Sequence, residues 1–222
     1  MNTSQLVHVY VPPTGGLPPS PGKLPDLLVV VLHGRGDSPA GFAWMPKVLD
    51  LKRVGYLMLQ APDRMYDGFS WYDLPPKQDA GVLRSRARIS ATLDELAGQG
   101  MPAERIVLFG FSQGCLMAVD VGLRYPKPLA GVCGVSGYVM WPEKAAAEAT
   151  PHARTLPWLI TAGREDPVIP FATTEAHVAA LKAAGIPVDW RGYHKDHTID
   201  PERELVDLRA WLAARAEAVA GR

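Results

Sequence analysis

The sequence has little of three features that would place it in a specialised class of protein. Only two of its 222 residues are cysteines, Cys115 and Cys133, too few for the disulfide framework of a small secreted domain. Its longest aliphatic run, 27–32, has six residues, whereas a transmembrane helix needs about 20. It also has no net charge, with 23 Lys and Arg against 23 Asp and Glu. We therefore expect reduced thiols and no membrane span.

The charge balance and the N-terminal residues bear on partners and location. Chains that bind nucleic acid usually carry a basic excess, because neutralising phosphates releases counterions, so we expect neither DNA nor RNA as a partner. Residues 1–10 contain no basic segment followed by an apolar one, which is the pattern of a secretory signal peptide. We therefore expect a cytoplasmic protein.

Short apolar runs alternate with segments of helical spacing from residue 26 to the C-terminus. The runs are continuous, which is typical of parallel strands that are covered on both faces. We predict strands at 6–11, 27–32, 56–60, 106–109, 129–135, 158–161 and 188–193. We predict helices at 39–50, 80–98, 113–124, 170–184 and 201–216, the last with Asp200 as its N-cap. This alternation predicts an α/β fold with a doubly wound, mostly parallel sheet flanked by helices.

A segment rich in proline and glycine, 12–25, follows the first predicted strand. Such a segment does not fit inside a helix or a sheet, and we expect a surface turn. A domain linker is the alternative, but the roughly ten residues before it are too few for a domain. No internal repeat or break in composition follows, so we expect residues 1–222 to form a single domain.

The strongest local signal is a serine between two glycines. Residues 110–114 read Gly-Phe-Ser-Gln-Gly, after a predicted strand and before a predicted helix. In a sharp strand-to-helix turn, small residues two positions before and after the serine let strand and helix approach closely and leave the hydroxyl exposed. Ser112 is therefore the expected nucleophile, with an ordinary tight turn as the alternative. Ser136 has the wrong glycine spacing.

A serine hydroxyl is a weak nucleophile at neutral pH and needs a base that is held by an acid. Asp166 and His197 each follow a later predicted strand, 54 and 85 residues after Ser112. The carboxyl ends of parallel strands meet at one edge of a sheet, where α/β folds bind ligands. The order serine, acid, histidine is that of hydrolases with such a turn. From the spacing alone, Glu165 is an alternative to Asp166, and His194 is an alternative to His197.

Metal and cofactor sites are not supported by the sequence. His194, Asp196 and His197 lie together, but two histidines three positions apart on a loop, without a third ligand in range, are a weak zinc pattern. The Gly-Lys at 22–23 and the Gly-Arg-Gly at 34–36 lack the further glycines of phosphate-binding loops. We expect neither a metal nor a cofactor.

Acyl transfer also needs hydrogen-bond donors aimed at the oxyanion of its tetrahedral intermediate. The backbone N–H of Gln113 is one candidate, because it lies at the start of the predicted helix, where the helix dipole favours an anion. The second candidate lies in the loop His-Gly-Arg-Gly-Asp at 33–37, where two glycines let the backbone turn inward. We expect this donor to be the N–H of Arg35.

Together these segments resemble the carboxylesterase/phospholipase family of α/β-hydrolases, which includes acyl-protein thioesterases. The similar segments are Leu-His-Gly-Arg-Gly-Asp at 32–37, Trp-Tyr-Asp at 71–73, the serine turn at 110–114, Ser-Gly-Tyr at 136–138, the acid loop at 163–170, and His197 before the final helix.

The resemblance implies an α/β-hydrolase fold in which Ser112 is the nucleophile, Asp166 the acid and His197 the base. It also implies that the oxyanion hole is formed by the N–H groups of Arg35 and Gln113. The alternatives Glu165 and His194 do not match the family pattern.

Two positions depart from that pattern. Asp196 stands where a glycine commonly precedes the base, so a charged side chain lies next to the imidazole. Arg35 stands between the oxyanion glycines, where an apolar residue is common. We expect Arg35 to favour an acidic or polar acyl or leaving group.

The substrate pocket is expected to be open and shallow. Only sixteen residues separate Trp141 from the strand that begins at Trp158, so no large lid domain is inserted there. Candidate substrate-binding walls are Trp71, Tyr138, Met140 and Trp141, although aromatic residues near strand ends equally often serve plain packing.

We therefore predict a serine carboxylesterase that hydrolyses short- to medium-chain esters of small molecules through an acyl-serine intermediate. An acyl-protein thioesterase or a lysophospholipase with the same triad is the alternative, because the acyl-enzyme is common to all of them. A non-catalytic binding protein with a hydrolase fold is a second alternative. The sequence is compatible with a monomer and with a homodimer.

Overall fold

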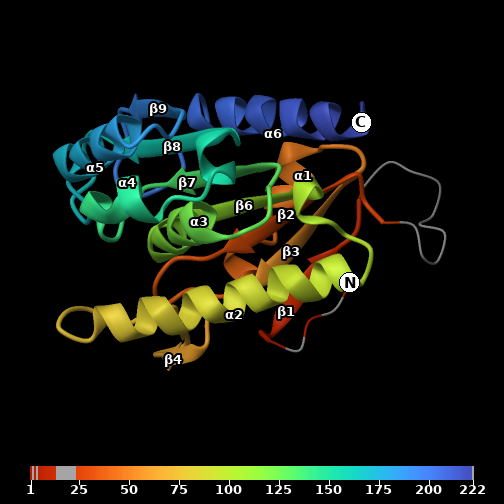
Figure 1. Ribbon diagram of the computed structural model, residues 1–222, viewed down its shortest axis with the longest axis horizontal. Coiled ribbons are helices and arrows are strands. Elements are labelled where there is room, and N and C mark those ends of the chain that lie inside the picture. The colour runs from red at the N-terminus through yellow and green to blue at the C-terminus, as the bar shows by residue number, and fades with distance from the viewer. Residues whose placement is uncertain (2, 4, 14–23, 222) are drawn as a thin grey trace.

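The computed structural model describes residues 1, 3, 5–13 and 24–221. Within these residues the main sheet has seven strands in the order β1-β3-β2-β6-β7-β8-β9 (Figure 1). The first strand pairs antiparallel with β3, and all other neighbours pair parallel. The strands are β1 His8–Val11, β2 Leu27–Leu32, β3 Val54–Leu59, β6 Ile106–Phe111, β7 Gly131–Val135, β8 Trp158–Gly163 and β9 Val188–Tyr193.

Helices cover both faces of this sheet, as expected for a doubly wound α/β fold. One face packs against α2 (Gln78–Gly98), α3 (Gln113–Arg124) and α5 (Phe171–Ala183). The other face packs against α1 (Met45–Leu49) and α6 (Glu204–Ala220). In Figure 1 the long helices α2 and α6 lie on opposite sides of the sheet, α6 above it and α2 below. Alternate residues of each central strand therefore enter two separate hydrophobic cores, and for this reason the strands read as continuous apolar runs.

The predicted strands agree with the observed ones to within two residues at each end. The prediction for the final helix was wrong at both ends, because α6 begins at Glu204 and ends at Ala220. Asp200 does accept hydrogen bonds from the N–H groups of Arg203 and Glu204 through Oδ2, at 2.7 and 3.2 Å. The chain makes a turn over 201–203 before α6 starts. The Asp200 carboxylate therefore accepts from N–H groups at the start of α6, although Asp200 lies four residues before the helix begins.

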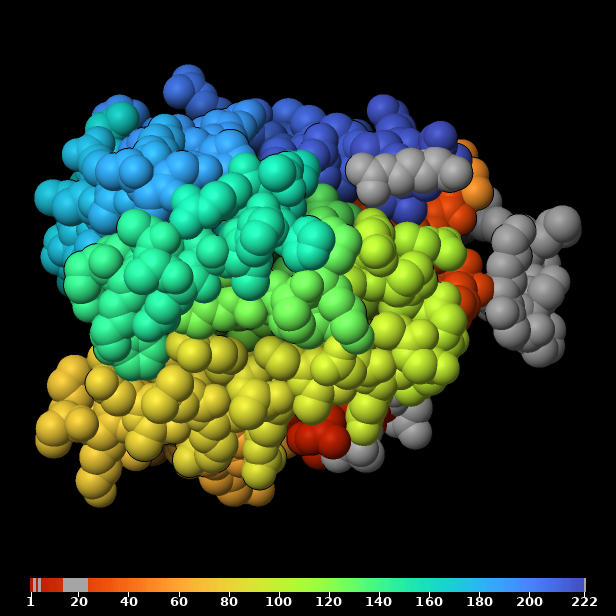
Figure 2. All heavy atoms as spheres, viewed as in Figure 1, coloured from red at the N-terminus to blue at the C-terminus, as the bar shows by residue number. Residues whose placement is uncertain are grey.

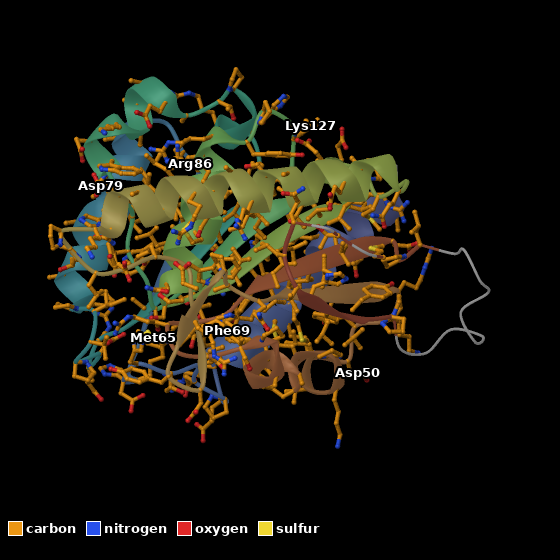
Figure 3. All side chains as sticks on the ribbon, turned by 90° about the horizontal axis from the view of Figure 1, so that it is seen from below. Asp50, Met65, Phe69, Asp79, Arg86 and Lys127 are labelled. Carbon is orange, nitrogen blue, oxygen red and sulfur yellow. The ribbon has the colours of Figure 1, made fainter. Side chains whose placement is uncertain are left out.

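Three further differences concern short elements. The predicted helix 39–50 is a 3-10 turn, Pro39–Phe42, followed by α1. A hairpin of β4 (Asp63–Met65) and β5 (Gly68–Ser70) was not predicted, because three-residue strands are too short for a periodic pattern. Figure 3 labels Met65 and Phe69 on this hairpin. Most of the proline-rich turn expected at 12–25 lies outside the described residues, since 14–23 are not among them.

The segment between β7 and β8 contains only short elements. They are a 3-10 turn at Pro142–Lys144, α4 at Ala145–Glu148 and another 3-10 turn at His152–Arg154. This segment packs beside α3, and Figure 2 shows its side chains lying against those of α2 on one face of the molecule. No lid is present among the described residues. None of the helices in the described ranges has the length and apolar character to cross a membrane.

Candidate active site

Ser112 lies at the sharp turn between β6 and α3. Its backbone has φ 54° and ψ −115°, a region that non-glycine residues rarely adopt. The two flanking glycines are required by space: a Cβ at position 110 would lie 2.0 Å from the carbonyl oxygen of Gly114, and a Cβ at position 114 would lie 1.9 Å from that of Leu32. The turn is fixed to the next strand, because the N–H of Ser112 donates to the carbonyl of Val135 at 2.9 Å.

Three expected side chains come together at the carboxyl edge of the sheet. The hydroxyl of Ser112 lies 2.9 Å from Nε2 of His197, and Nδ1 of His197 lies 2.7 Å from Oδ2 of Asp166. A carboxylate only accepts, so Nδ1–H donates to Asp166 and Nε2 is left to accept from the serine. The other oxygen of Asp166 accepts from the N–H groups of Val168 and Ile169, at 2.8 and 2.9 Å. The carboxylate is therefore fixed in orientation.

The two alternatives left open by spacing lie elsewhere. Glu165 and His194 face each other at 3.4 Å, and their side chains are 67% and 77% exposed. Neither takes part in the hydrogen-bond chain that runs from Ser112 through His197 to Asp166. They lie on the same two loops as Asp166 and His197, but in the solvent.

The loop after β2 lies directly on the serine turn. A Cβ at Gly34 would meet the Phe111 ring at 3.2 Å and Cβ of Ser112 at 3.5 Å. The N–H groups of Gly36 and Asp37 donate to Phe69 and Gly34, at 2.8 and 3.3 Å.

The two backbone donors expected for the oxyanion hole have no hydrogen-bond partner among the described residues. Among the described residues the N–H of Arg35 has no acceptor, and the N–H of Gln113 is the first of α3, which has none within the helix.

Sequence reasoning missed the role of His33, which fixes this loop from inside. Burial lowers the pKa of His33, which favours the neutral ring. Its Nδ1–H donates to the carbonyl of Gly34 at 2.7 Å, and its Nε2 accepts from the N–H of Ala61 at 3.1 Å. The indole N–H of Trp71 donates to the carbonyl of His33 at 2.9 Å. The available signal was the histidine in the motif at 32–37.

The side chain of Gln113 has a structural role, separate from that of its backbone N–H. Its Oε1 accepts from the N–H of Trp71 and from the Ser70 hydroxyl, at 3.0 and 3.1 Å. Its Nε2 donates to the carbonyl of Tyr72 at 2.7 Å. This buried amide joins the segment after β5 to the start of α3, so the Trp-Tyr-Asp motif and the serine turn are parts of one hydrogen-bonded unit.

A buried ion pair holds the loop that carries His197. The ammonium of Lys195 lies 2.6 and 2.5 Å from the two oxygens of Glu204, and both side chains are almost fully buried. Lys195 also donates to the hydroxyl of Ser136 at 3.1 Å and to the carbonyl of Thr198 at 2.7 Å. Burial lowers the pKa of Lys195, and the Glu204 carboxylate opposes this shift. The pair ties β7, the histidine loop and α6 together.

The candidate pocket walls have different environments. Trp71 is fully buried, so its indole forms no surface for a substrate. Tyr138 accepts a hydrogen bond from Gln78 and, like Met140, packs partly buried against the core. Trp141 is surrounded by cations, with its ring centroid 5.7 Å from Arg86, 5.8 Å from Arg124 and 4.8 Å from Lys144. Arg86, labelled in Figure 3, also forms a bidentate ion pair with the buried Asp120. Trp141 thus packs against the core while three cationic side chains lie around its ring.

A metal site is not found in the part of the chain that the structure describes, where no three His, Cys, Asp or Glu side chains are grouped to hold an ion. Both cysteines are buried free thiols, and burial raises the pKa of Cys115 to about 12.

Comparison with known proteins decides the family. Residues 19–215 match the phospholipase/carboxylesterase family. The chain belongs to this family. Acyl-protein thioesterase 1 of Schizosaccharomyces pombe is 32% identical over 166 residues, which cover 69% of this chain and 74% of that protein. Carboxylesterase SOBER1 of Arabidopsis thaliana is 27% identical over 205 residues, covering 84% and 90%.

Solved structures share the fold of this phospholipase/carboxylesterase family member. Esterase PE8 superimposes with a TM-score of 0.81 at 26% identity, covering 94% of this chain and 98% of that one. Acyl-protein thioesterase 2 of Zea mays gives a TM-score of 0.77 at 25% identity, covering 95% and 99%. The chain is thus an α/β-hydrolase of an ester-hydrolysing family, and its relatives include carboxylesterases and thioesterases.

Proposed function

We propose that this protein is a serine carboxylesterase that hydrolyses short- to medium-chain esters of small molecules through an acyl-serine intermediate. The observation that carries the proposal is the hydrogen-bond chain from the Ser112 hydroxyl to His197, at 2.9 Å, and from His197 to Asp166, at 2.7 Å. A serine within hydrogen-bond reach of a histidine that is itself oriented by a carboxylate has the geometry of an activated nucleophile.

In the proposed mechanism His197 accepts the proton of Ser112 as its oxygen attacks the ester carbon. The N–H groups of Arg35 and Gln113 then donate to the oxyanion. When the tetrahedral intermediate collapses, His197 gives its proton to the leaving alcohol and an acyl-serine remains. Water attacks this acyl group while His197 takes its proton. His197 then returns the proton to the Ser112 oxygen as the bond to the acyl carbon breaks, and the carboxylic acid leaves. Asp166 keeps the imidazole in the required tautomer throughout.

The preference for small esters rests on the short segment between β7 and β8, which contains no lid in the described residues. The proposal treats 1–222 as one domain, because both hydrophobic cores are built on the same central strands. A thioesterase or a lysophospholipase would use the same residues, and relatives named as thioesterases support the first of these. A binding protein without turnover is the other competing function.

Initial rates on p-nitrophenyl acetate, butyrate, octanoate and palmitate test the proposal. We expect the wild type to hydrolyse the shorter esters and Ser112→Ala to lose at least about 10³-fold in kcat. Ser90→Ala, on α2, is the matched control. A p-nitrophenyl ester and an S-aryl thioester of butyrate, measured side by side, compare the two substrate classes. Equal rates in wild type and Ser112→Ala, or no turnover of any ester, would favour the binding protein.

A further inference from the structure

A cleft of about 360 Å³ opens beside His197. This volume lies within the roughly 300–1,000 Å³ that is usual for small-molecule pockets. Its apolar walls belong to the core that α1 and α6 cover, whereas Tyr138, Met140 and Trp141 pack against the other core. Its lining residues include Asp37, Phe42, Trp44, Phe111, His197 and Ile199.

The walls form a row of aromatic rings that leads outward from the imidazole. The Phe111 ring lies 5.1 Å from the ring of His197, and Phe42 lies 6.2 Å from Phe111 and 6.3 Å from Trp44, between centroids. Phe42 is buried in the core, whereas Trp44, Phe111 and Ile199 are only partly buried. Apolar surface next to the imidazole therefore faces an open space large enough for a ring or a branched chain.

The position of His197 decides which part of an ester this space fits. Nε2 of His197 lies 2.9 Å from the Ser112 oxygen and is the atom that returns the proton to the departing group. The leaving oxygen must therefore lie against Nε2 when the tetrahedral intermediate collapses. A cleft with His197 in its own wall adjoins the leaving group, and the acyl chain extends from the reacting carbon in another direction.

We propose that this cleft binds the leaving group of the substrate and that it favours an aromatic or other bulky apolar alcohol or thiol. The inference rests on the proposed function, because it uses His197 as the acid for the leaving group. Among the described residues that line the cleft, Asp37 supplies the one carboxylate. A carboxylate at this place disfavours a phosphate-bearing leaving group, such as that of a lysophospholipid.

The test varies the leaving group and the acyl group separately. Methyl, benzyl and naphthylmethyl butyrates share one acyl group, and methyl acetate, butyrate and octanoate share one leaving group. We measure kcat/KM, because it reports acylation, the step in which the leaving group departs. We expect Trp44→Ala to lower the benzyl-to-methyl ratio about tenfold, as for a lost contact in an apolar pocket. The dependence on acyl length should keep its shape.

Two further variants control the experiment. Val48→Ala removes a half-exposed side chain of α1, the short helix that follows Trp44, outside the cleft, and should keep the wild-type ratio. Trp44→Leu keeps an apolar side chain and should give an intermediate ratio. If the variants misfold, a measurement on the wild type alone still tests the inference. Benzyl alcohol should inhibit methyl butyrate hydrolysis competitively, and it should inhibit more strongly than glycerol phosphate.

The outcomes separate the two proposals. An unchanged leaving-group ratio in folded Trp44→Ala, or a lack of competition by benzyl alcohol, overturns the inference while the esterase stands. A changed dependence on acyl length with a constant leaving-group ratio assigns the cleft to the acyl chain and also overturns it. If the wild type hydrolyses neither methyl butyrate nor the p-nitrophenyl esters, the proposed function fails, and the inference fails with it.

Discussion

Arg35 is exposed on the loop after β2, and its guanidinium has no ion-pair partner among the described residues. We expect Arg35→Leu to lower kcat/KM for an anionic ester, such as a hemisuccinate, about two- to fivefold relative to a neutral butyrate. This is the size of an exposed charge interaction, about 0.5–1 kcal/mol, and it should weaken as salt is added. The measurement is the ratio of the two kcat/KM values at low and high ionic strength.

Arg53→Leu is the matched control for this prediction. Arg53 pairs with Asp26 at the opposite edge of the sheet, so its loss should leave the ratio of anionic to neutral ester unchanged. An unchanged ratio in Arg35→Leu would show that the guanidinium does not reach the substrate. The departure of position 35 from the family pattern would then have no role in specificity.

Single residues differ in how far the sequence reveals them. Ser112 could be proposed because two glycines at fixed spacing have a steric cause, which the contacts at 110 and 114 make explicit. Lys195 could not, because a lysine in a loop between two histidines reads as a solvated side chain. Its burial depends on Glu204 and Ser136, and their distance from Lys195 is set only by the packing of α6 and β7.

At the scale of elements, the ion pair of Lys195 and Glu204 joins the histidine loop to the first turn of α6. We expect Glu204→Gln to destabilise the protein by about 3–5 kcal/mol, because it leaves a buried ammonium without its counter-charge. Burial already lowers the pKa of Lys195. The folded protein therefore releases this proton at lower pH than the unfolded chain, and part of the lost stability should return as pH rises toward the ordinary lysine pKa. Urea unfolding at several pH values measures both effects.

The double variant Lys195→Met/Glu204→Gln is the control for this prediction. It removes both charges, so it should recover most of the stability that Glu204→Gln loses. A cost below about 1 kcal/mol for Glu204→Gln alone, or no recovery in the double variant, would contradict the idea that an uncompensated charge is responsible.

The strands of the main sheet were easier to predict than the ends of α6 or the shortest elements. The six-residue strands β2 and β9 match their predicted ranges. β2 is a continuous apolar run, whereas β9 alternates apolar and charged residues over 188–191, and both patterns are typical of strands. The β4–β5 hairpin was missed, although its Phe69 pairs with the loop at Asp37 and so helps to shape the site. Its two strands pair with each other across residues 66 and 67, and three residues are too few to show a periodic pattern along the chain.

At the scale of the whole molecule, the sheet separates two hydrophobic cores, and α6 closes one of them with Leu208 and Leu212. Leu212 is fully buried. We expect Leu212→Ala to destabilise the protein by about 2–5 kcal/mol, because it removes apolar contacts and leaves a cavity. The urea midpoint should fall while the slope of the transition stays the same. Ester turnover without urea should persist, since the core under α6 lies beneath the site.

Val206→Ala is the comparison for this variant. Val206 lies on the same helix with 61% of its surface exposed, so its truncation should change stability by no more than about 0.5 kcal/mol. Equal effects of the two variants would mean that α6 contributes to stability mainly through its helical backbone rather than through the buried side.

The sequence by itself determined the fold class and the serine turn, because both are recorded locally. For the acid and the base, spacing left Glu165 and His194 open, and only the resemblance to the family pattern favoured Asp166 and His197. Apolar runs indicate strands that are covered on two faces. The glycine spacing indicates a sharp turn in which larger residues would clash at positions 110 and 114. The tertiary structure decided what depends on distant contacts. It placed His33, Trp71 and Gln113 in one hydrogen-bonded unit, paired Lys195 with Glu204, and set a row of aromatic rings beside His197. These arrangements follow from how strands and helices pack in three dimensions, and spacing along the chain does not encode them.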